Sequence, residues 1–433
     1  MLSALLFPGQ LRYRPRLCAG TWRGCLMTAA LLSCYRASAQ EALRNSMTGE
    51  AAAEARKVQL ESLPYTVKSG DFRLLAVPSF GVDWNDNINI SKTDPLSDFI
   101  LEPGLQLNLS YPVTQNNLLS LNVGVGYQQY LEHPQYSTWY LSSGTDLSFD
   151  IYVKNVWINL HDRVSYIQDT SQQPTLTGTA NYAAINNTAG LSATWDLNEL
   201  TLSTGYDHLN LIPTTEQYAY QQQASEMLFA RGGWQVYPGV TPGIEGTAAF
   251  TTYNETVLNN NNNYSLGAYV DWQAGKAFSI EARGGYTIYR FQDTSQSIQT
   301  SDVNGWYVDL NISHQITDAI GYTLDAGHEF QLGIQSDLTE DWYFRPAVHW
   351  HVMKYVDLNG SLSYQNGTQG VGNISGNFVE SYNWLGATVG ASFALMKRVS
   401  LGVSYRLTLR SSNLPSDEYT QNVVGLLLTY RPQ

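Results

Sequence analysis

The sequence predicts an all-β protein that crosses a membrane as an up-and-down antiparallel β-barrel of about 18 strands, with short periplasmic turns and long extracellular loops. Three observations predict this fold. Apolar and polar residues alternate from residue 72 to the end, the alternating runs are long, and the connections between them switch between short and long. Of the 433 residues, 12% are aromatic, 29 are tyrosine and only 14% of the chain is charged, which excludes a disordered acidic protein.

The alternation has a period of two, which places successive side chains on opposite faces of a strand. It is clearest where Leu119, Leu121, Val123, Val125 and Tyr127 are separated by small or polar residues. Most runs are roughly 10 to 14 residues long, and a tilted strand needs roughly 9 to 11 to cross a bilayer. Strands are predicted near residues 74–84, 101–113, 117–130, 138–151, 156–168, 187–196, 199–209, 224–236, 240–252, 264–272, 277–290, 304–313, 320–330, 340–352, 356–364, 382–395, 399–410 and 419–430.

The connections between these strands carry the stronger signal. Longer polar loops are predicted at residues 169–186, 259–263 and 365–381, and the sequence leaves open whether the first of them folds into the barrel. Short turns on one rim, long loops on the other and both chain ends on the short side are typical of outer-membrane barrels. The short turns are predicted at residues 114–116, 152–155, 197–198, 237–239, 273–276, 314–319, 353–355 and 396–398.

One face of the predicted strands is apolar and ends in aromatic residues at both rims, as do the lipid-facing girdles of membrane barrels. A soluble β-propeller would instead show an internal repeat of about 40 to 50 residues, which is not found. The apolar face comprises Leu147, Phe149, Ile151, Leu228, Ala230, Leu266, Ala268, Val270, Ile280, Ala282, Val308, Leu310, Ile312, Val424, Leu426 and Leu428. The girdles comprise Tyr111, Trp195, Trp234, Trp272, Trp350 and Tyr430 at the short-turn rim, and Tyr127, Trp139, Tyr166, Tyr206, Tyr264, Tyr286, Trp306, Trp342, Tyr364 and Tyr405 at the other.

The opposite face is polar and carries five arginines against ten acidic residues, which indicates contact with water. Two interpretations stay open. The arginines form a charged constriction that screens solutes, or acids across the wall neutralise each of them, for example Asp325 or Asp357 beside Arg345. The residues expected to line the pore are Arg163, Arg231, Arg283, Arg345, Arg406, Asp146, Glu245, Glu281, Asp309, Asp325 and Asp357, with Asp150, Asp207, Asp271 and Glu329 on the same face.

The N-terminus resembles an export signal. Residues 1–39 hold five arginines and no acid, then a short apolar run and Ala37-Ser38-Ala39, so they are predicted to be a signal peptide cleaved after Ala39. A short buried helix and a lipoprotein signal at Cys34 are the alternatives. All three cysteines lie in this segment, so neither disulfides nor cysteine-bound metals are expected in the mature chain. Residues 40–71 are predicted to be a partly helical periplasmic segment, with the helix ended by Pro64, and residues 72–433 the barrel.

Charge and motifs exclude several functions. After residue 39 the chain holds 19 basic and 37 acidic residues, a net charge of −18, which argues against nucleic acid as a partner. No P-loop, dinucleotide-binding, H-E-x-x-H or G-x-S-x-G motif occurs, and the scattered His133, His208 and His328 do not predict an enzyme. We expect no cofactor.

Two possible metal sites also have simpler interpretations. His349 and His351 share a strand face at a spacing that suits a metal, but no third ligand is identifiable nearby. Residues 83–87 are rich in oxygen ligands for a weak calcium site, but they lack the EF-hand pattern, and a solvated strand end with Asx turns is the preferred interpretation. We therefore expect no metal.

The first strand running into Asn85-Asp86-Asn87-Ile88, the tyrosine-rich alternating strands and the final Val424-x-Leu426-x-Leu428-x-Tyr430 resemble the Putative beta-barrel porin 2 family. The resemblance covers about residues 70 to 433. It implies an outer-membrane β-barrel, and some members of the family are associated with exopolysaccharide systems. One departure is that Arg431-Pro432-Gln433 follow the last aromatic residue, whereas outer-membrane barrels usually end on an aromatic residue.

Together these observations predict a porin of the bacterial outer membrane that lets small hydrophilic solutes diffuse passively and prefers cations. The alternative is a component of exopolysaccharide export or surface attachment with a closed lumen. Expected partners are outer-membrane lipids and lipopolysaccharide, the barrel assembly machinery, and small hydrophilic solutes or polysaccharide.

Overall fold

The computed structural model describes residues 65–168, 170, 173–296, 298–374 and 379–432, which all fall in one compact unit. The predicted signal peptide and the helix expected near residues 41–63 lie outside this part, and they stay predictions. Of residues 40–71, the structure describes the last few, where β1 (Val67–Ser69) pairs with the start of the first long strand. In the described part of the chain, no helix is long and apolar enough to span a membrane.

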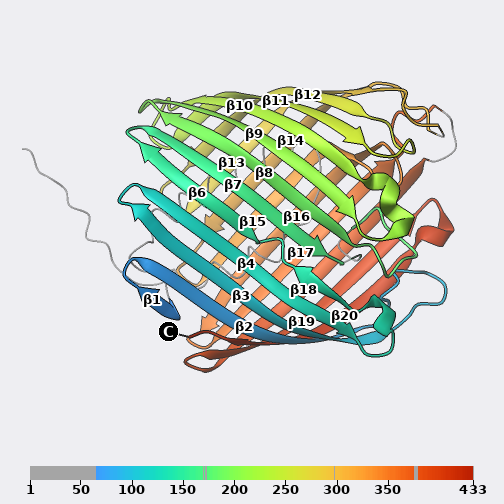
Figure 1. The fold of residues 1–433 in the computed structure, drawn as a ribbon, viewed down its shortest axis with the longest axis horizontal. Helices are drawn as coiled ribbons and strands as arrows, with labels where there is room; N and C mark the ends of the chain where they lie inside the picture. Colours follow the sequence, from blue (N-terminus) through green and yellow to red (C-terminus); the bar gives the residue numbers. More distant parts are fainter. Residues whose placement is uncertain (1–64, 169, 171–172, 297, 375–378, 433) are drawn as a thin grey trace, which may run out of the picture. The chain divides into compact units, whose positions relative to one another are not determined.

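The described residues are almost entirely β-structure (Figure 1). After β1 the strands are β2 (Phe72–Asn85), β3 (Asp98–Thr114), β4 (Asn117–Tyr130), β5 (Thr138–Leu141), β6 (Asp146–Val153), β7 (Val156–Ile167), β8 (Ala184–Asp196), β9 (Leu200–Pro213), β10 (Gln223–Trp234), β11 (Val240–Tyr253), β12 (Asn261–Gln273), β13 (Phe278–Phe291), β14 (Val303–Gln315), β15 (Ile320–Leu332), β16 (Leu338–Met353), β17 (Val356–Gln369), β18 (Glu380–Met396), β19 (Val399–Ser412) and β20 (Tyr419–Tyr430). Short 3-10 turns interrupt three loops: η2 (Pro134–Tyr136), η4 (Glu216–Gln221) and η5 (Pro415–Asp417).

Neighbouring strands pair antiparallel, and the ring closes where β2 pairs with β20, from Ser79 opposite Thr429 to Asn85 opposite Val423. Of the twenty described strands, β1 pairs only with β2, while β5 and β6 both pair with β4 and β7 and so share one place. This leaves 18 strands in the barrel, which confirms the predicted fold. The uninterrupted barrel strands contain 12 to 17 residues, slightly more than the sequence predicted.

One predicted strand, residues 138–151, is divided into β5 and β6. The interruption is Ser142-Ser143-Gly144-Thr145, where the Ser142 N–H donates to the Gly124 carbonyl and the Thr145 hydroxyl accepts the Gly124 N–H. A side chain therefore replaces part of the backbone ladder at this point. Small polar residues permit the bulge, and the alternation on each side of it still resembles one continuous strand.

The turns confirm the predicted asymmetry between the two ends of the barrel. Figure 1 shows tight turns at one end and longer loops with the 3-10 turns at the other. Residues with positive φ occupy several tight turns, including Lys154, Asn198 and Gly239. A Cβ at Gly239 would lie 2.3 Å from the Gln273 carbonyl oxygen, so both its φ of 81° and the close approach require glycine.

The outer face of the barrel is apolar, and the predicted alternation is confirmed there. Leu228, Leu266 and Val270 are exposed on this face, as are Leu426 and Leu428 on the last strand. Most of the predicted rim aromatics are exposed as well: Tyr111, Trp139, Trp195, Tyr206, Trp234, Tyr264, Trp272, Tyr286, Trp306, Trp342, Trp350, Tyr364, Tyr405 and Tyr430.

The inner wall is built from tyrosines that lie over glycines of neighbouring strands. A Cβ at Gly267 would lie 2.2 Å from the Tyr307 hydroxyl, and one at Gly285 would lie 2.8 Å from the Tyr307 ring. Tyr269 covers Gly233 and Gly243 in the same way. The missing side chain lets each ring lie flat against the wall, which explains why a chain with an inner polar face carries so many tyrosines and glycines.

Candidate functional site

Arginines on the inner wall are paired with acids from neighbouring strands. Arg231 on β10 reaches across to Asp271 on β12 at 3.1 Å and Glu281 on β13 at 3.2 Å, and its guanidinium lies 3.5 Å from the Tyr269 ring centre. Three more ion pairs join residues directly opposite in register: Arg163 with Asp146 (3.4 Å), Arg283 with Asp309 (3.3 Å) and Arg345 with Asp325 (3.3 Å).

These contacts favour the neutralised-wall interpretation over a ring of uncompensated arginines. Arg345 pairs with Asp325, one of its two expected partners, while Asp357 instead contacts the His351 ring. Arg406 lies half-buried on the inner face of β19. Each of these contacts holds a guanidinium group beside an acid on the wall.

Several inner carboxylates remain accessible to solvent. The side chains of Asp271, Glu281 and Asp325 are 38%, 29% and 28% exposed, although alternation turns them all toward the interior. An interior filled by packing would bury such groups almost completely. This level of the barrel therefore has room for water beside its charged wall.

A second polar cluster, on β6, β7 and β9, is fully buried. The Asn159 amide donates to Asp150 at 2.7 Å, and the two ring nitrogens of His161 contact Asn159 at 2.9 Å and Asp207 at 2.8 Å. The Trp157 indole N–H also donates to Asp150, at 3.1 Å. The sequence placed the two acids on the inner face but did not single out His161, because alternation predicts the face of a residue and not its partners.

The described residues between β7 and β8, which are 168, 170 and 173–183 and are called loop 168–183, fold into the barrel. Leu176 is fully buried in a cluster with Ile90 from the β2–β3 loop and with Tyr382, Trp384 and Tyr419 from β18 and β20. The Gly178 N–H donates to the Ile90 carbonyl at 3.0 Å. The loop that follows β7 thus packs against β18 and β20, which are not neighbours of β7 or β8. In this position it narrows the opening of the barrel at the long-loop end.

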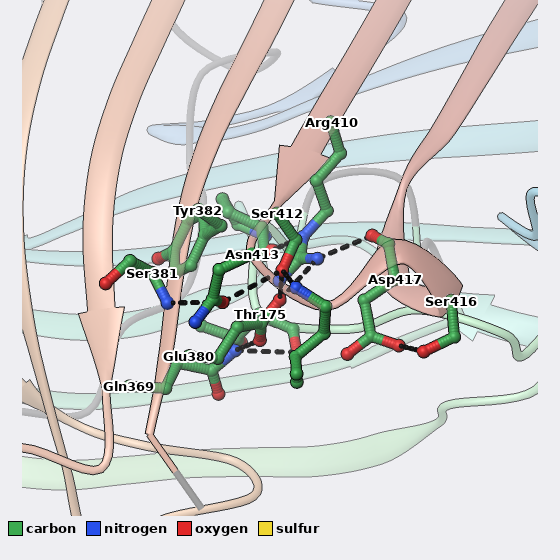
Figure 2. A network of polar contacts seen from close by, with 12 residues as sticks. Thr175, Gln369, Glu380, Ser381, Tyr382, Arg410, Ser412, Asn413, Ser416 and Asp417 are labelled. Carbon is green, nitrogen blue, oxygen red and sulfur yellow. Dashed lines mark hydrogen bonds and ion pairs between the residues drawn. The ribbon is translucent and has the colours of Figure 1, made fainter.

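A buried ion pair holds the tip of this loop (Figure 2). The Arg410 guanidinium on β19 donates to the Pro174 carbonyl at 2.8 Å and lies 2.7 Å from the Glu380 carboxylate on β18. Gln369 donates to Glu380 at 2.8 Å and reaches the Thr175 carbonyl at 3.4 Å. We call Gln369, Glu380 and Arg410 the loop anchor. Removing one member of a buried pair typically costs about 3 to 5 kcal/mol.

Tyrosines complete the narrowed mouth. Tyr182 from the loop and Tyr218 from η4 pack edge to face, 5.0 Å between ring centres, and the Tyr182 hydroxyl donates to Gln221 at 2.8 Å. Burial raises the pKa of both tyrosines above the usual value, so the neutral hydroxyl is favoured. The sequence missed the loop anchor and this cluster. The available signals were the apolar Leu176 in a polar loop and Arg410, which shares the inner face of β19 with Arg406.

The two sets of residues weighed as possible metal sites make other contacts. The Asn87 N–H donates to the Asn85 side chain at 2.9 Å, which is an Asx turn, and Asp86 accepts from Asn422. His349 and His351 lie near the short-turn end, with ring centres 6.4 Å apart. Among the described residues, no group of three or more His, Cys, Asp or Glu side chains is arranged to hold a metal ion.

Comparison with solved structures finds proteins of Pseudomonas aeruginosa, among them the outer membrane protein OpdK. OccK2 (OpdF), in complex with glucuronate, is 10% identical with a TM-score of 0.48, over 84% of this chain and 99% of that one. OccK5 (OpdH) is 9% identical with a TM-score of 0.46, over 83% and 98%. OpdK with vanillate is 9% identical with a TM-score of 0.45, over 83% and 98%.

Comparison with curated proteins finds no match. The family model described as Putative beta-barrel porin 2 matches residues 64–432, which includes every strand of the barrel. The chain therefore belongs to the Putative beta-barrel porin 2 family, and it is a β-barrel porin of the Gram-negative outer membrane.

Proposed function

We propose that the barrel carries small hydrophilic solutes across the outer membrane and favours cations. The observation that carries this proposal is the solvent exposure of the inner carboxylates Asp271, Glu281 and Asp325. Barrels of this strand number leave an aqueous channel. The pore-lining residues in this proposal are Arg163, Arg231, Arg283, Arg345, Arg406, Asp146, Glu245, Glu281, Asp309, Asp325 and Asp357.

The preference for cations follows from the charge of the inner wall. Ten acidic residues face five arginines on the predicted inner face, and at least four of the arginines contact acids. The unbalanced carboxylates attract cations within roughly a Debye length, about 8 to 10 Å at physiological salt. No catalytic group is assigned in this proposal.

The inward loop favours a narrow channel over a general diffusion pore. It also gives support to a second candidate, a component of exopolysaccharide export or surface attachment with a closed lumen. The observation behind this alternative is the buried hydrophobic cluster at the long-loop end, which includes Leu176, Tyr182 and Tyr382. We expect short turns in the periplasm, loops at the cell surface, lipopolysaccharide against the outer girdle, and assembly by the barrel assembly machinery.

Planar bilayer recording separates the two candidates. Stable open steps from the purified, folded protein support the narrow channel, with a conductance well below that of an unobstructed barrel of equal size. A silent protein whose folding is verified by heat-modifiable electrophoretic mobility supports the closed lumen. A variant that releases the loop should then conduct, which would place the obstruction in loop 168–183.

A further inference from the structure

A small pocket lies in the inner wall, lined by residues of the six consecutive strands from β11 to β16. We call it the Glu245 pocket. Its lining includes Glu245, Arg283, Tyr307, Asp309, Glu329 and Tyr343. It is separate from the loop anchor, which lies on β17, β18 and β19.

Two tyrosines line the Glu245 pocket, and each lies over glycines of neighbouring strands. Tyr307 lies over Gly267 and Gly285, and a Cβ at Gly327 would meet the Tyr343 hydroxyl at 2.5 Å. The Tyr307 hydroxyl donates to Glu245 at 3.0 Å, and the Tyr343 hydroxyl donates to Asp309. The glycines leave room for both rings against the wall, and the two hydrogen bonds fix the positions of the hydroxyls.

Glu245 supplies an acceptor that this wall leaves unused. Glu245 is only 2% exposed, and one of its carboxylate oxygens accepts a hydrogen bond from the Tyr307 hydroxyl. The other oxygen, Oε2, is buried and has no hydrogen-bond donor among the described residues. A buried carboxylate oxygen needs a donor, and the ammonium group of a bound solute can supply one.

The neighbouring arginines are held by other acids. Arg231, directly opposite Glu245 in register, binds Asp271 and Glu281, and Arg283 binds Asp309. The lining named above therefore carries three carboxylates against one guanidinium. This balance favours a positively charged donor in the pocket.

The nature of the pocket favours an organic cation over a metal ion. No described group of three or more side chains is arranged as a metal site, and Tyr307 and Tyr343 add hydroxyls and ring faces. Ring faces attract ammonium and guanidinium groups, which also donate several hydrogen bonds. We propose that the Glu245 pocket is a binding subsite for small organic cations that carry a primary ammonium or guanidinium group. This proposal rests on the channel function and specifies its solute class.

Binding can be measured without any transport. The probe is n-butylammonium, titrated into the purified, folded protein in detergent and followed by calorimetry, with 1-butanol as the uncharged control of similar shape. We expect saturable binding of n-butylammonium and none of 1-butanol. Glu245→Gln should weaken binding by about tenfold or more, because it removes a charge-assisted hydrogen bond. Asp318→Asn removes the same charge from the exposed turn between β14 and β15, outside the pocket and the pore lining, and should change binding less than about twofold.

If Glu245→Gln does not fold, Ser265→Asn tests the same site, because it narrows the pocket and keeps every charge. It should also abolish binding. Equal binding by wild type and either pocket variant, or no binding by the folded wild-type protein, would overturn the proposal. Binding without conductance would support the subsite and contradict the channel function. Conductance without binding would support the channel function and contradict the subsite.

Discussion

Arg410 and Glu380 form an ion pair at 2.7 Å that is almost completely buried inside the barrel. The same guanidinium donates to the Pro174 carbonyl, 236 residues away in the sequence. The pair therefore attaches the loop that follows β7 to the inner wall formed by β18 and β19. A loop held in this way narrows the mouth without any strand having to move.

Arg410→Met should release the loop and raise the conductance. It leaves Glu380 buried without its partner, and such a loss costs about 3 to 5 kcal/mol. Limited proteolysis within residues 173–183 and single-channel recording measure the two effects. Arg290→Met is the matched control, since it removes the same charge from an exposed ion pair with Asp302 outside the assigned pore lining. Equal protease resistance and conductance in wild type and Arg410→Met would show that the anchor does not hold the loop.

Val270→Arg should impair folding, because Val270 is exposed on the outer face. An arginine facing lipid at mid-bilayer costs about 2 to 4 kcal/mol. Asp271→Asn, the next residue along the strand, should be tolerated, since its side chain is partly exposed inside the barrel. The folded fraction in lipid, measured by heat-modifiable mobility, decides between them. Equal folding of the two variants would contradict the assigned faces.

Gly285→Ala should destabilise the barrel by about 1 to 3 kcal/mol, as overpacking typically does. The new Cβ would lie 2.3 Å from the Leu266 carbonyl oxygen and 2.8 Å from the Tyr307 ring. Gly144→Ala is the control, because a Cβ there meets nothing within 4 Å. Urea unfolding of both variants provides the measurement. Similar midpoints would mean that tyrosine packing on glycine contributes little.

Neutralising the exposed carboxylates should reduce the preference for cations. Asp271→Asn combined with Asp325→Asn removes two negative charges that solvent reaches, while their partners Arg231 and Arg345 stay positive. The reversal potential in dilute salt should therefore shift toward anions. In 1 M salt the shift should fade, because the Debye length falls to about 3 Å. Unchanged selectivity of the double variant in dilute salt would show that Asp271 and Asp325 do not determine the preference for cations.

The sequence predicted the barrel because the signals are local. The alternation that places Leu266 outside and Gly267 inside is visible within one strand, and turn length is visible between two strands. The interruption at residues 142–145 was missed because the alternation continues on both sides of it. Local patterns thus specify strand count, faces and rims.

Contacts across the barrel could not be predicted in this way. The inward fold of loop 168–183 depends on Arg410 and Leu176 meeting partners far away in the sequence. His161 was likewise missed, since its partner Asp207 lies on a strand that is not adjacent to its own. Alternation placed the charged residues on the inner face, but only the three-dimensional arrangement identifies the acid beside each arginine.

The reversal potential of the purified, folded protein across a gradient of dilute potassium chloride tests the central claim most directly. We expect stable open steps and a potential whose sign shows preference for potassium. A folded protein that gives no steps, or one whose potential shows preference for chloride, would contradict a cation-preferring channel.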